Sequence, residues 1–260
     1  MIKENKRLFV KLTIIMCLLA LTIIIIYTID TPYRNSRKLI DAIENNDVTA
    51  AEKILVSGQD PDIPSIRPLK ILSFWGISPE LPLAIACRKG NYEMVNLLIS
   101  HGASANGVSG AGRTPMRETL FYFQKDDVEI IKLLLANGAD TESQGDLLPV
   151  CYAAKMNPKE YDPTMENGTV FKGDYNEAIA QDITEIVLLL LEDRDPNIAS
   201  GGGTTLLMHA ASVGNIYLVN HLLSIGADKT LTNRLGETAH DIAIKNGHQE
   251  VAFLLERTTQ

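Results

Sequence analysis

Residues 203–228 read GTTLLMHAASVGNIYLVNHLLSIGAD, and this stretch decides the fold class. It holds two apolar segments with helical spacing, separated by Gly214 and followed by Gly226. Glycine ends a helix at little cost because its left-handed backbone meets no Cβ. Thr205 stands where a hydroxyl side chain caps the start of the first segment. The stretch therefore predicts two short helices joined by a tight turn.

The second half of this stretch recurs along the chain. Each copy is an apolar segment that ends in leucines, followed by a glycine and then a small or acidic residue. The glycine position falls at Gly58, Gly102, Gly138, Arg194 and Gly226, at intervals of 44, 36, 56 and 32 residues. A recurring period of about 33 residues indicates a repeat protein, and the two longer intervals then contain insertions.

The first half of the stretch also recurs, ahead of the leucine-rich segments. Its copies are LPLAIACRKGN (81–91), GRTPMRETL (112–120), LPVCYAAKM (148–156), GTTLLMHAASVGN (203–215) and GETAHDIAIKNGH (236–248). Together the two phrases resemble the ankyrin repeat, in which a turn and a Thr-Pro-Leu-His signature lead into two helices. The resemblance covers residues 37–258 in about six units. It implies an all-α, ankyrin-type solenoid of helix–turn–helix repeats with protruding hairpin turns.

The spacing of apolar residues supports this fold on physical grounds. Residues at helical spacing predict a buried stripe along the second helix of each unit. The stripe comprises Val95, Leu97, Leu98, Ile131, Leu134, Val187, Leu190, Val219, Leu222, Val251 and Leu254. One unit cannot bury its own stripe, so neighbouring units have to stack. Departures from the pattern include residues 120–123, Leu-Phe-Tyr-Phe, in place of an Ala-Ala pair, and Arg194 in a glycine position.

Residues 12–29 form an uncharged apolar run, LTIIMCLLALTIIIIYTI, that follows a short basic tail at residues 1–11. As a helix, eighteen residues span roughly 27 Å, close to the thickness of a bilayer core. We expect a transmembrane anchor, followed by a tether at residues 30–36 and the repeat domain. The alternative is a cleaved secretory signal, although no small-residue cleavage site follows the run.

Basic residues on the two sides of this run bear on its orientation. Four precede it, and Arg34, Arg37 and Lys38 follow it among acidic residues. The balance predicts a cytoplasmic amino terminus and an extracytoplasmic repeat domain. Two alternatives stay open, namely cytoplasmic repeats and a protein secreted after signal cleavage.

Composition excludes several functions. The chain charge of −8 and the +3 of residues 1–29 leave −11 on residues 30–260, so nucleic acid is not an expected partner. Cys87 and Cys151 stand at core positions of the repeats, which predicts reduced thiols and no disulfide framework. The five histidines lack the spacing of a helical metal site. The sequence therefore predicts no catalytic residue, cofactor or metal, and no enzyme.

Two insertions interrupt the repeats, at residues 60–80 and 157–180. The first contains the only tryptophan, Trp75, which either covers the apolar flank of the first unit or anchors a partner. The second contains Tyr161, Phe171 and Tyr175, and a loop of this length within a repeat is often part of the binding face.

In ankyrin proteins, partners lie across the hairpin tips and the concave helix face. The resemblance therefore implies a scaffold for a protein partner, held at the membrane by residues 12–29. The implied partner-binding residues, with those of the insertions, are Trp75, Arg88, Lys89, Arg113, Tyr152, Lys155, Tyr161, Phe171, Tyr175, Met208, Ser212 and Arg234. An alternative role is a protective or inhibitory protein that masks a toxin or a redox enzyme at the membrane.

Overall fold

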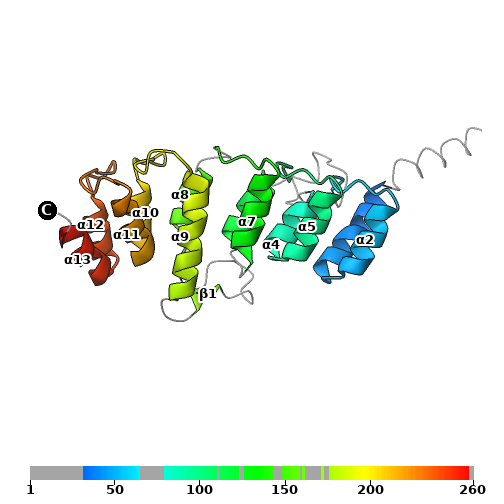
Figure 1. Ribbon diagram of the computed structural model, residues 1–260, viewed down its shortest axis with the longest axis horizontal. Helices are drawn as coiled ribbons and strands as arrows, with labels where there is room; N and C mark the ends of the chain where they lie inside the picture. The colour runs from blue at the N-terminus through cyan, green and yellow to red at the C-terminus, as the bar shows by residue number, and fades with distance from the viewer. Residues whose placement is uncertain are drawn as a thin grey trace, which may run out of the picture.

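The computed structural model describes residues 32–64, 79–109, 112–122, 126–142, 148–158, 160–161, 171–172 and 176–257. Within these ranges the helices are arranged in pairs along a single row (Figure 1). The first helices are residues 32–44, α4 (Pro82–Arg88), α6 (Pro115–Phe121), α8 (Pro149–Ala154), α10 (Leu206–Val213) and α12 (Ala239–Lys245). The second helices are α2 (Val48–Val56), α5 (Tyr92–Ser100), α7 (Asp127–Ala136), α9 (Glu177–Leu191), α11 (Ile216–Ser224) and α13 (Gln249–Arg257).

The row consists of two layers, as the ankyrin-type prediction requires. First helices contact one another in order from α4 to α12, and second helices contact one another from α2 to α13. Nine of the eleven predicted stripe residues are buried, and Leu97 and Leu254 are half-buried. The apolar core therefore runs continuously between the layers, and each unit completes the burial of its neighbour.

Capping residues fix where the short first helices begin. Thr114, Thr205 and Thr238 each accept a hydrogen bond on the hydroxyl oxygen from the backbone N–H three residues later. Gly214 ends α10 with φ of 74°, and a Cβ there would collide with the ring of His248. That ring lies 3.2 Å from the Ser212 carbonyl oxygen, measured from Nε2. The predicted cap at Thr205 and the left-handed backbone at Gly214 are confirmed.

Asparagine side chains connect successive units at the edge that carries the hairpin tips. Asn106 donates from Nδ2 to the Gly138 carbonyl at 2.8 Å and accepts from the Asp140 backbone N–H at 2.8 Å. Asn197 accepts from the Asp228 backbone N–H at 2.7 Å in the same way. Each bridge satisfies backbone groups left over at a helix end, so it fixes the register between units.

Arg194 makes the corresponding connection between the third and fourth units. Its guanidinium donates to the Thr141 carbonyl at 3.3 Å and to the Thr141 hydroxyl, and pairs with Glu142 at 3.2 Å. The left-handed residue that ends α9 is Glu192, with φ of 48°. The assignment of Arg194 to the glycine position is therefore wrong, because the turn after α9 begins two residues earlier and leaves this side chain to bridge two units.

The second insertion differs from the all-α prediction. Two short antiparallel strands, β1 (Glu160–Tyr161) and β2 (Phe171–Lys172), pair Tyr161 with Phe171 in register. The Asn176 backbone N–H donates to the Pro158 carbonyl at 2.8 Å and closes the base of this hairpin. Helix α9 begins at Glu177, so the last four residues of the expected insertion are its first turn.

The helix at residues 32–44 begins inside the segment that we expected to be a tether. Ser36 is fully buried, and its hydroxyl donates to the Ile63 carbonyl at 2.5 Å. The start of the first insertion thus packs on the first unit. Residues 12–29, Trp75 and Tyr175 lie outside the described residues. In the part of the chain that is described, no helix is long and apolar enough to cross a membrane.

Candidate protein-interaction surface

Five of the predicted binding residues come together on the first-helix layer of units two to four. Arg88 and Lys89 end α4, Arg113 precedes α6, and Tyr152 and Lys155 belong to the end of α8. We call their surface, together with Arg117, Phe121 and Tyr122 of the α6 segment, the first-helix face. Its members come from three helices that contact one another in order.

Aromatic rings form the apolar part of the first-helix face. Phe121 is 38% exposed, and its ring packs edge-on against Tyr122 with centroids 4.9 Å apart. The Phe121 and Tyr152 centroids are 6.2 Å apart, which joins α6 to α8. Exposed aromatic rings held by neighbouring rings are rigid contact area, the kind of surface in which interaction hot spots are enriched.

Ion pairs join the first-helix face to the first unit. Arg88 pairs with Glu80 at 2.7 Å and with Glu44 at 3.6 Å, and Lys89 also pairs with Glu44, at 3.2 Å. Burial lowers the pKa of the Arg88 guanidinium, but the carboxylates of Glu80, Glu118 and Glu44 outweigh it and raise that pKa on balance. The guanidinium therefore has a fixed position and a fixed charge.

A buried carboxylate lies beneath the same surface. Glu118 is 3% exposed, and its Oε1 pairs with Arg113 Nε at 3.2 Å, while Oε2 has no hydrogen-bond partner among the described residues. Burial raises the pKa of Glu118, and the charges of Arg113 and Arg88 oppose that rise. We predicted Arg113 as a partner contact at a hairpin tip. In the structure it also stabilises the fold, because its guanidinium compensates the buried charge of Glu118.

His209 of α10 is buried beside the hairpin tip of the fifth unit. Its Nε2 lies 3.3 Å from the Ser200 hydroxyl. Burial, with a smaller contribution from Lys155, lowers the pKa of His209 from 6.5 to about 4. A histidine with so low a pKa is neutral at physiological pH, so the His209 and Ser200 pair is suited to holding the tip in place and not to general-base catalysis.

The low pKa predicts acid sensitivity. Because the unfolded chain binds this proton more readily than the folded chain, stability is fully present above pH 6.5 and decreases as pH falls toward 4. The loss amounts to roughly 3 kcal/mol at the lower end. Denaturant unfolding at pH 7 and pH 5 measures the first part of this loss, roughly 2 kcal/mol. His209→Gln loses less stability over that interval, whereas the exposed control His101→Gln behaves like the parent; an equal loss in both variants contradicts the assignment.

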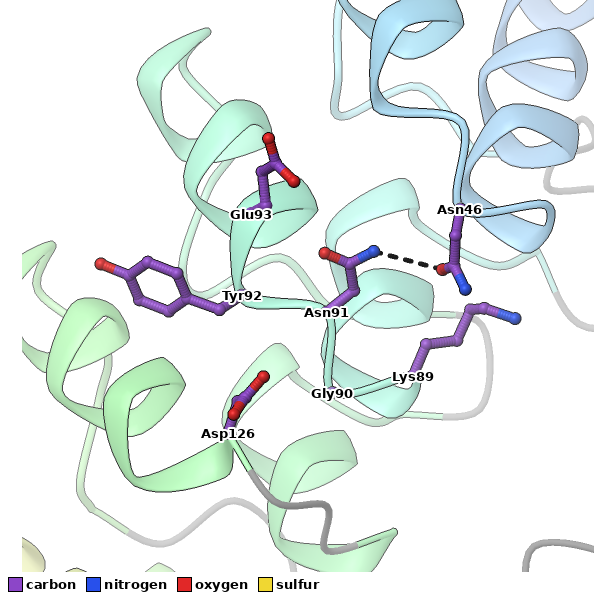
Figure 2. Close-up of a pocket in the computed structure, with 7 residues that line it drawn as sticks. All are labelled: Asn46, Lys89, Gly90, Asn91, Tyr92, Glu93 and Asp126. Atoms are coloured by element: carbon purple, nitrogen blue, oxygen red, sulfur yellow. Dashed lines mark hydrogen bonds between the residues drawn. The ribbon is translucent and has the colours of Figure 1, made fainter.

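A shallow pocket lies at the edge opposite the hairpin tips, where the turns between the paired helices align (Figure 2). Asn46 of the first unit accepts a hydrogen bond from Asn91 of the second at 3.2 Å. The lining residues are Asn46, Lys89, Gly90, Asn91, Tyr92, Glu93 and Asp126. The polar lining and open shape match a surface groove between repeats and not an enclosed ligand cavity.

The predicted binding residues of units five and six lie outside the first-helix face. Met208 is 1% exposed, so the prediction that it contacts a partner is wrong; its sulfur accepts from the Thr205 backbone N–H within the helix cap. Ser212 is half-buried, and its hydroxyl donates to the His209 carbonyl at 2.7 Å. Arg234 is exposed at the tip of the sixth unit, and its backbone N–H donates to the Gly202 carbonyl at 3.1 Å.

Sequence reasoning missed Arg117, Phe121 and Tyr122. The signal was present, because residues 120–123 replace an Ala-Ala pair with Leu-Phe-Tyr-Phe. Phe121 occupies the helix position that Arg88, Lys155 and Ser212 occupy in the neighbouring first helices. Aligning α4, α6, α8, α10 and α12 position by position would have identified it.

Reactive groups are poorly placed for catalysis in this surface. Cys87 and Cys151 are buried free thiols, as predicted. Burial raises the pKa of both thiols, that of Cys151 to about 11, so the nucleophilic thiolate is rare at neutral pH. Among the described residues, no three His, Cys, Asp or Glu side chains are grouped as metal ligands.

Comparison with known proteins agrees with the stacked helix pairs. The family model for ankyrin repeats (3 copies) matches residues 39–145 and 176–259, which is more than half of the chain. The gap between these matches contains residues 157–175 of the second insertion. The chain therefore belongs to the ankyrin-repeat family.

Individual relatives are distant and much longer. Human Ankyrin repeat and SOCS box protein 14 is 32% identical over 116 residues, which are 44% of this chain and 17% of the relative. Rat Ankyrin repeat and SOCS box protein 2 is 25% identical over 190 residues, 73% of this chain and 26% of the relative. Transcription factor MBP1 of Saccharomyces cerevisiae is 29% identical over 177 residues, 64% of this chain and 19% of the relative. The chain spans about a quarter or less of these proteins.

Proposed function

We propose that this ankyrin-repeat protein is a membrane-anchored scaffold that holds a partner protein on its first-helix face and adjoining hairpin tips. The observation that carries the proposal is the exposed Phe121 ring, which packs near Tyr152 on a helix layer whose neighbouring helices end in Arg88 and Lys155. Aromatic and arginine side chains in one rigid patch are typical of interaction hot spots.

Anchoring rests on residues 12–29, whose length and composition suit a bilayer span. The basic residues before that run favour an amino terminus in the cytoplasm and repeats on the other side. A tag placed after Gln260 tests the topology in intact cells. Protease applied from outside removes the tag if the repeats are extracytoplasmic; a tag protected until the membrane is opened contradicts this orientation.

Site-specific photo-crosslinking tests the interaction surface. We place a photoreactive phenylalanine analogue at position 121 of the full chain, expressed in its own cells. The matched control carries it at Phe253 of α13, which is also exposed, at 56%, but lies in the second-helix layer. We expect one discrete partner band from position 121 and none at that mass from position 253. Equal capture at both positions, or none at 121, contradicts the proposed surface.

A further inference from the structure

Acidic and basic residues are distributed unequally between the two helix layers, although the chain as a whole is acidic. Helix α9 of the second layer carries Glu177, Asp182 and Glu185 and no Lys or Arg. In the first layer, α4 and its cap carry Arg88 and Lys89, and α8 is followed by Lys155, without an acidic residue in either helix. Acidic residues of the chain lie in second-layer helices such as α9 and in the turns and insertions, so the net charge describes the first-helix face poorly.

The first-helix face already binds carboxylates from its own chain. Glu44 and Glu80 pair with Arg88, and Glu44 also pairs with Lys89. Glu118 pairs with Arg113 below the surface. On the unit-two side of the face, the positive side chains are therefore already paired with carboxylates of the same chain.

On the unit-four side of the face, one cationic side chain is available to a partner, that of Lys155. Lys155 is exposed and forms no ion pair within the described part of the chain. It follows Tyr152 by three residues, so both side chains lie on one side of the α8 end. The Phe121 ring is next to Tyr152, with 6.2 Å between the centroids. Lys155, without an ion pair among the described residues, therefore lies beside the exposed Phe121 ring and the half-buried Tyr152 ring.

We propose that Lys155, Phe121 and Tyr152 form a docking site for an acidic segment of the partner protein that also carries an apolar side chain. The apolar side chain packs on Phe121 and Tyr152, and the carboxylates face Lys155 and the Arg117 side of α6. Charge complementarity with this face selects an acidic occupant. This inference rests on the proposed scaffold function and specifies its partner, since the net charge of −11 on residues 30–260 alone would favour a basic one.

Peptide binding to the full chain in zwitterionic nanodiscs tests the proposal. The probes are a fluorescent peptide with glutamates on both sides of a central Leu-Phe pair, and its twin with lysines in place of the glutamates. We expect saturable binding of the acidic peptide that weakens with added salt, and at least about tenfold weaker binding of the basic twin. Tighter binding of the basic twin overturns the proposal.

Matched variants locate the site. Lys155→Glu and Phe121→Ala each weaken acidic-peptide binding about tenfold, as hot-spot truncations do. Lys53→Glu on α2 makes the same change of net charge, and Phe253→Ala on α13 removes a more exposed ring; both leave binding unchanged. Equal losses in Lys155→Glu and Lys53→Glu overturn the site. If the acidic peptide does not bind while position 121 still crosslinks a partner, the scaffold function stands and only this inference fails.

Discussion

Replacing Leu222 with aspartate unfolds at least the last two repeat units. Leu222 is fully buried in the middle of the stripe of α11, where no cationic side chain is expected to reach it. An unpaired carboxylate in such a place costs several kcal/mol. Each repeat packs only on its neighbours. Unfolding of α11 therefore also exposes the apolar surface of α13 in the last unit, which packs against it. The effect is comparable to the whole stability of a small domain.

Circular dichroism and amide hydrogen exchange measure the result for Leu222→Asp. Helical signal decreases, and amides of α10 to α13 exchange rapidly, while those of α4 to α7 keep more of their protection. The control is Asn220→Asp, which adds the same charge to an exposed position of the same helix. Native-like dichroism and protection in Leu222→Asp contradict the assignment of this residue to the shared core.

The sequence predicted the repeat architecture because its determinants are local. A threonine cap, a left-handed glycine and leucines at helical spacing act within one unit, and they recur. Val95, Ile131 and Leu222 are buried as that spacing requires. The offset at Arg194 escaped prediction because nothing local distinguishes a turn that begins at Glu192 from one two residues later. Only the contact of Arg194 with the third unit shows its role.

The first-helix face was predicted only in part because it is assembled by stacking. Arg88, Phe121 and Lys155 are far apart in sequence and come to lie on neighbouring helices only when the repeats stack. Met208 was misplaced for a related reason. It was assigned to the surface as a member of the first helix, but it stands at the third position after the Thr205 cap, where the side chain turns back toward the helix start and into the core.

The second large effect is expected from Arg113→Ala. Glu118 is 3% exposed, and Arg113 is the strongest influence that opposes the rise of its pKa by burial. Removing the guanidinium leaves a buried carboxylate without its ion-pair partner, for which losses of about 3 kcal/mol are typical. Chemical denaturation at pH 7 measures the difference in the free energy of unfolding between the variant and the parent.

A double variant separates the buried charge from lost packing. Glu118→Met replaces the carboxylate by an apolar side chain of similar size and is expected to be nearly neutral, because Arg113 is partly exposed and keeps access to water. Arg113→Ala combined with Glu118→Met then recovers most of the loss. If the losses of the single variants instead add, Arg113 stabilises the fold through its own packing and not through Glu118.

The pH dependence of Arg113→Ala gives an independent test with a defined sign. Without the guanidinium the pKa of Glu118 rises further, so the folded variant binds a proton more readily than the unfolded chain. Its deficit relative to the parent is then smallest at acidic pH and grows as pH rises through the folded-state pKa. The acid sensitivity from His209 affects parent and variant equally and cancels in this difference. A deficit that does not change with pH would mean that the cost of losing Arg113 is unrelated to the charge of Glu118.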